Sequence, residues 1–116
     1  MANLREKILA VKDIKEKVVH IDEWETEVLI RGLNGAKRAR LLQNNIDKQG
    51  AINFERMYPE LLILTVHDPE SKEPVFQPED RDALNAKNGG VIEKLVQVAM
   101  TLSGLDAQAV ESAVKN

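Results

Sequence analysis

Few side chains in this sequence have the types and spacing that metal binding requires. The two histidines, His20 and His67, lie far apart, and neither has a second histidine or a carboxylate at a typical metal-ligand spacing. Asp22 and Asp68 lie near them, but both aspartates fall in expected turns. Cysteine is absent, which removes disulfides, thiol nucleophiles and thiolate metal sites. We therefore expect structural or solvated histidines, with no metal and no cofactor.

Paired carboxylates and serines are the other candidates for catalytic chemistry. A glycosidase-like pair needs a cleft and a raised pKa on one carboxyl, whereas the acidic pairs here fall in turns and helix starts. These pairs are Glu23 with Glu25, Glu79 with Asp80, and Asp80 with Asp82. The serines (Ser71, Ser103 and Ser112) have neither a nucleophile-elbow motif nor a paired base. We expect solvated carboxylates, no catalytic residue and no enzyme.

Segment 32–38, GLNGAKR, follows an expected strand and opens an expected helix, which is a context in which phosphate can bind. It lacks both the Walker spacing and the GxGxxG pattern, so a turn with Asn34 as helix cap is favoured. Lys37, Arg38 and Arg40 form a basic cluster on the outward face of that helix. Because the whole chain carries a net charge of -3, we interpret this cluster as a solvated or protein-binding surface rather than a nucleic-acid site.

Composition indicates an ordinary globular protein. The chain has 116 residues, of which 43% are hydrophobic and 30% charged, and we expect one domain over residues 1–116. Aromatic residues make up only 3%, which leaves little for stacking bases. The N-terminal segment has the pattern of neither a signal peptide nor a membrane span, and no later apolar run approaches about 18 residues. We expect a soluble intracellular protein with no membrane or nucleic-acid partner.

The hydrophobic pattern predicts an α+β fold, mostly α-helical, with one antiparallel hairpin near the N-terminus. Residues 4–11 carry a short helical stripe. Runs rich in β-branched residues at 18–21 and 27–31 flank the polar turn 22–25, which is typical of a hairpin. Trp24, near this turn, is expected to anchor the hairpin by covering a helix end.

Two helices are expected in the middle of the chain. The first covers residues 35–48, with Gly50 suited to a left-handed cap. Its inward positions are expected to be Ala36, Ala39, Leu42 and Ile46. The second begins near Tyr58 and runs to Val66, because Pro59 is tolerated in a first turn; a buried strand over residues 61–66 is the alternative. A charged, hairpin-like loop follows at residues 68–73.

The C-terminal third is expected to be helical and to complete the core. A short helix begins at residues 77–80 and ends at the glycine pair in residues 88–90. Residues 91–102 form the strongest helix, with a wide apolar face that we interpret as core, and Ser103-Gly104 ends it. Asp106 is suited to cap a last, weakly apolar helix.

The order of these segments resembles the tail assembly chaperones of siphophages and prophages. Residues 24–33 (WETEVLIRGL) precede the charged stretch AKRAR at 36–40. An apolar stretch ending in aspartate, LTVHD at 64–68, leads through the turn to Val75-Phe76, an acidic helix start and Leu84, and the last long helix ends in LSGL. The resemblance covers roughly residues 15–115. The family often has glycine after the tryptophan, where this chain has Glu25.

The resemblance implies a chaperone without catalytic activity. Such proteins bind the tape measure protein, keep it soluble and help to recruit tail tube subunits, so the major tail protein is a second expected partner. The resemblance also implies action in the host cytoplasm and absence from the mature virion. Our hypothesis is that weakly self-associating copies coat the tape measure protein. Some members have a longer form made by a ribosomal frameshift.

We expect partner contacts at Lys37, Arg38, Arg40, Asp68, Glu70 and Lys72. Two alternative functions stay open. One is a small head–tail connector or other morphogenesis component, and the other is a regulatory nucleic-acid-binding protein, which rests only on the basic helix.

Overall fold

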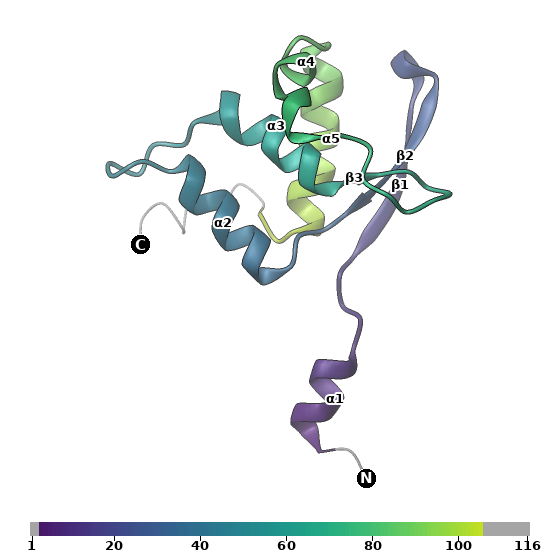
Figure 1. The fold of residues 1–116 in the computed structure, drawn as a ribbon, viewed down its shortest axis with the longest axis vertical. Helices are drawn as coiled ribbons and strands as arrows, with labels where there is room; N and C mark the ends of the chain where they lie inside the picture. Colours follow the sequence, from purple (N-terminus) through teal and green to yellow (C-terminus); the bar gives the residue numbers. More distant parts are fainter. Residues whose placement is uncertain (1–2, 106–116) are drawn as a thin grey trace.

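The structure, a computed structural model, describes residues 3–105 (Figure 1). The expected helix after Asp106 lies outside this part of the chain. The helices and strands are, in order, α1 (Leu4–Ala10), β1 (Glu16–Ile21), the 3-10 helix η1 (Asp22–Trp24), β2 (Thr26–Arg31), α2 (Gly35–Asn45), α3 (Phe54–Thr65), β3 (Val66–His67), the 3-10 helix η2 (Pro78–Asp80), α4 (Arg81–Asn85) and α5 (Gly89–Leu102). The predicted α+β fold, with helices and an N-terminal hairpin, is confirmed.

The predicted hairpin is the larger part of an antiparallel sheet with the strand order β1-β2-β3. In the hairpin, Val19 pairs with Val28. Glu25 ends the connecting turn in the left-handed conformation, with φ 51° and ψ 43°. Glycine adopts this conformation most readily, so the turn has the geometry that a glycine after Trp24 would favour.

The third strand was not predicted. Strand β3 pairs with β2 through Leu29 and His67 and through Ile30 and Val66. The preceding residues are helical through Thr65, so helix rather than the alternative strand over 61–66 is confirmed, and the helix ends one residue before the predicted Val66. Periodicity could not reveal β3, because a two-residue strand has no measurable period.

Helix α3 begins at Phe54, four residues before the predicted start at Tyr58. Pro59 lies inside the helix and has no backbone N–H to donate to the carbonyl of Glu55. The side-chain amide of Asn85 donates to this carbonyl instead, at 2.9 Å. The prediction was wrong because it allowed proline only in a first turn, whereas a residue of α4 supplies the missing hydrogen bond.

Helix α2 has the predicted cap, since the Asn34 Oδ1 atom accepts from the backbone N–H of Lys37 at 2.9 Å. The helix ends at Asn45 rather than at residue 48, and Gly50 has φ 82° in the following loop instead of capping the helix. Its inward face is also rotated from the prediction. Leu41 and Asn45 are buried, Leu42 and Ile46 are half-buried, and Ala36 and Ala39 are exposed.

Helix α5 contains the glycine pair that was expected to precede it. Asn88 caps the helix by accepting from the backbone N–H of Val91 at 3.1 Å. The helix ends at Leu102, and Gly104 has φ 71°, as expected of a terminator. The buried residues of α5 are Val91, Ile92, Leu95, Val96, Ala99 and Met100, which confirms that its apolar face belongs to the core.

The core lies where α3 and α5 pack together at one side of the sheet (Figure 1). Ile21, Ile30, Leu61 and Leu95 are fully buried there. Trp24 is partly buried and packs against this core, as its anchoring role requires.

The end of β2 fits closely against the end of α5. Gly32 donates its backbone N–H to the Lys15 carbonyl at 2.8 Å. A Cβ atom on Gly32 would lie 2.5 Å from the Leu102 carbonyl oxygen. The buried N–H of Leu33 donates to the Ser103 hydroxyl at 3.0 Å. These contacts fix the position at which α2 leaves the sheet.

Candidate binding surfaces

The three basic residues predicted as partner contacts do not form one exposed patch. Lys37 and Arg40 are exposed on α2. Arg38 is half-buried, and its Nη2 atom donates to the Gly104 carbonyl at 3.4 Å. Arg38 therefore helps to join α2 to the end of α5, whereas the other two remain available to a partner.

The predicted charged loop after β3 is a hairpin-like turn. Asp68 donates its backbone N–H to the Glu73 carbonyl at 2.8 Å, and His67 forms a β-bridge with Pro74. The Asp68 carboxylate accepts from the backbone N–H of Glu70 at 2.8 Å, so Asp68 shapes the loop. Glu70 and Lys72 are exposed, and in Figure 1 the loop projects past the sheet on the side away from α2.

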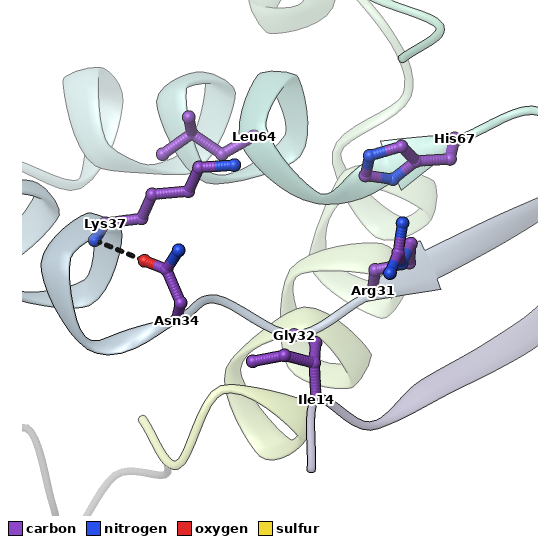
Figure 2. A pocket seen from close by; sticks show the side chains of 7 residues that line it. All are labelled: Ile14, Arg31, Gly32, Asn34, Lys37, Leu64 and His67. Atoms are coloured by element: carbon purple, nitrogen blue, oxygen red, sulfur yellow. Dashed lines mark hydrogen bonds between the residues drawn. The ribbon is translucent and has the colours of Figure 1, made fainter. Parts of the chain in front are cut away.

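A pocket lies between the ends of β2 and β3 and the start of α2, and Figure 2 shows it from close by. Its volume is about 160 Å³. Its lining comprises Ile14, Arg31, Gly32, Asn34, Lys37, Leu64 and His67. Three of these side chains are basic and come from three elements: Arg31 from β2, Lys37 from α2 and His67 from β3. Only Lys37 among them was predicted as a contact residue.

A hydrogen bond to the backbone defines the tautomer of the His67 ring in this pocket. Its Nδ1 atom lies 2.7 Å from the Thr65 carbonyl oxygen. Because a carbonyl only accepts, Nδ1 carries a hydrogen, and Nε2 has the lone pair when the ring is neutral. Arg31 is partly paired, with its Nε atom 3.3 Å from the Glu16 Oε2 atom and both side chains almost half exposed.

Most of the other side chains considered for metal binding or catalysis lie on the surface. The Nε2 atom of His20 is 2.9 Å from the Asp22 carboxylate, and both side chains are largely exposed. Glu23, Glu25, Glu79 and Asp82 are exposed as well. Within residues 3–105, no group of three or more potential ligands could hold a metal ion. No helix in this range is long and apolar enough to cross a membrane.

Helix α1 is also exposed, and it was not predicted as a partner contact. It projects away from the body of the protein (Figure 1), and none of its residues is buried. Leu4, Ile8 and Leu9 are 71%, 59% and 68% exposed, and Val11 after the helix is 58% exposed. Large apolar side chains gathered on one short helix usually mark an interaction site.

Fold and surface together define a small α+β protein with several exposed elements suited to contacting other proteins. A family model described as phage tail assembly chaperone matches residues 3–115. The chain therefore belongs to the phage tail assembly chaperone family, and the resemblance noted in its sequence is confirmed.

A solved structure agrees at the level of the fold. The chain is similar to the tail assembly chaperone of bacteriophage HK97, with a TM-score of 0.58 and 21% sequence identity. The match covers 86% of this chain and 98% of that one. A search of curated protein sequences found no match.

Proposed function

We propose that this phage tail assembly chaperone binds the tape measure protein of its phage and keeps it soluble until the tail tube forms. Family membership supports a role in tail assembly. The exposed apolar side chains of α1 support binding of the tape measure protein. A chaperone for a long helical protein needs an apolar surface that is available before assembly.

The geometry of α1 suits an amphipathic helical partner. Leu4 and Ile8 are four residues apart on the helix, so they share one face, and the exposed Val11 follows at the C-cap. A seven-residue helix is marginally stable in water, and packing against a second helix would stabilise it. We propose that this face of α1 packs on the apolar stripe of a tape measure helix.

The wider functional proposal follows from the family. We propose that the chain acts without catalysis in the host cytoplasm, is absent from the mature virion, contacts the major tail protein and self-associates weakly. We also propose that residues 1–116 form one domain. In support, residues from Val19 to Leu105 contribute to a single hydrophobic cluster.

Co-expression with the tape measure protein from the same genome tests the proposal. We expect the chaperone to raise the soluble fraction of the tape measure protein and to co-purify with it. An insoluble tape measure protein and no complex, with both the chain and any frameshifted longer form, would contradict the proposed function.

Substitutions in α1 test the contact itself. Leu4→Ser combined with Ile8→Ser should abolish co-purification without unfolding the protein, because both side chains are exposed. Glu6→Ser, on the opposite face of the same helix, is the matched control and should leave binding unchanged. Equal binding by the double variant would exclude α1 as the contact while leaving the chaperone role intact.

A further inference from the structure

We infer that the pocket between β2, α2 and β3 binds a single carboxylate side chain of a protein partner. Its volume of about 160 Å³ is well below the roughly 300–1,000 Å³ typical of small-molecule sites. A space of this size suits one side chain that a partner inserts. The identity of the partner rests on the proposed function, which makes the carboxylate an aspartate or glutamate on a tape measure helix.

The charges around the pocket favour an anion. Arg31 and Lys37 are cationic, and His67 adds a third positive charge when its Nε2 atom is protonated. Within residues 3–105, Lys37 forms no ion pair, and the single carboxylate paired with Arg31 is the half-exposed Glu16. The pocket therefore holds more positive than negative charge.

The side chains around the pocket can supply several hydrogen bonds to a carboxylate. Figure 2 shows Lys37 and His67 extending toward each other from opposite sides, with Arg31 beneath His67. The Oδ1 atom of Asn34 accepts from the Lys37 backbone, which leaves the Asn34 amide NH2 as a further donor. An ionised carboxylate only accepts hydrogen bonds, and its bonds to cationic donors are among the strongest in proteins.

The apolar part of the lining favours a side chain over an inorganic anion. Ile14 and Leu64 line the same pocket as the basic groups, and Figure 2 shows Leu64 next to Lys37 and Ile14 next to Gly32. They can contact the methylene groups of an aspartate or glutamate, or an apolar neighbour on the same partner helix. Phosphate has no apolar part that would use these contacts.

The surroundings of the pocket disfavour an extended polyanion. Glu16 pairs with Arg31 at one side of the pocket, and Asp68, Glu70 and Glu73 belong to the charged loop that begins after His67. A nucleic-acid backbone that crossed the pocket would meet Glu16, whereas one side chain inserted between the basic groups avoids it.

Two charge substitutions separate the pocket from general electrostatics. Lys37→Gln removes one positive charge from the pocket, and Lys48→Gln removes one from an exposed position outside it, in the loop after α2. Lys37→Arg restores the charge. We expect Lys37→Gln to weaken tape measure binding about 3- to 10-fold, because the lost interaction is a charge-assisted hydrogen bond at a partly exposed site. We expect Lys48→Gln to leave binding within about twofold of wild type, as is usual for an exposed charge outside the contact.

A direct titration tests the pocket without the tape measure protein. N-acetylglutamate N-methylamide is added to the 15N-labelled full chain, and the neutral glutamine analogue and inorganic phosphate serve as comparisons. We expect amide chemical-shift changes confined to residues 14, 31–37, 64 and 67, with the largest response to the glutamate compound. Lys37→Gln should reduce this response and Lys48→Gln should not. An equal response to the glutamine analogue or to phosphate would overturn the assignment to a carboxylate side chain.

The two experiments distinguish failure of the pocket from failure of the proposed function. If wild type binds the tape measure protein and Lys37→Gln binds equally well, the pocket inference is wrong and the chaperone proposal stands. If wild type does not bind the tape measure protein but the titration gives the expected shifts, the partner is wrong and the carboxylate pocket stands.

Discussion

Replacing Gly32 by alanine should destabilise the protein through a backbone clash. The added Cβ atom would lie 2.5 Å from the carbonyl oxygen and 3.0 Å from the carbonyl carbon of Leu102. It would also lie 3.4 Å from the Lys15 carbonyl oxygen. All three neighbours are main-chain atoms, so no side-chain rotation relieves the overlap, and the junction of β2 with α5 must move apart.

The expected magnitude combines two effects of opposite sign. Overpacking of this kind costs about 1–3 kcal/mol. Alanine also restricts the unfolded chain, which by itself raises the free energy of unfolding by about 0.4–1 kcal/mol. The free energy of unfolding should therefore fall by about 1–2 kcal/mol, and Tm should fall by roughly 4–8 °C for a domain of this size. Thermal and urea unfolding followed by circular dichroism measure both quantities.

Gly35→Ala is the matched control for this experiment. An added Cβ atom there would meet nothing within 4 Å. Alanine at this position therefore restricts the unfolded chain to the same extent without causing a clash. The free energy of unfolding should stay equal or rise by up to about 1 kcal/mol. If the two variants were equally stable, the close fit between β2 and α5 would be refuted.

Three further predictions address single contacts. Ser103→Ala leaves a buried backbone N–H without an acceptor and should lower the free energy of unfolding by about 1–3 kcal/mol in urea titrations; unchanged stability would show that another acceptor replaces the hydroxyl. Glu25→Gly relieves the left-handed conformation at φ 51° and should raise that free energy by up to about 1 kcal/mol, whereas a loss would contradict the turn geometry. Burial, followed by the charge of Glu93 and a hydrogen bond to it, raises the pKa of the Tyr58 phenol above 10.0. The unfolded state then loses its proton first, so stability should fall as pH rises above about 10, and Tyr58→Phe should reduce this fall in unfolding experiments across that range.

Local patterns in the sequence determined much of the fold. The two β-branched runs predicted the hairpin, because alternation and β propensity act between neighbouring residues. The wide apolar stripe of α5 predicted its burial, and Asn34 was recognisable as a cap since it bonds only three residues along the chain. The order of such segments was also enough to indicate the family.

Contacts between distant segments were decided only by the tertiary structure. The proline inside α3 is compensated by Asn85, which lies 30 residues from the carbonyl that it satisfies. The need for glycine at position 32 arises from the backbone of Leu102, on a different element. The basic pocket exists because the short strand β3 places His67 beside the end of β2, within reach of Lys37 on α2. No local propensity encodes such neighbours, because packing of the core brings them together after the local structure has formed.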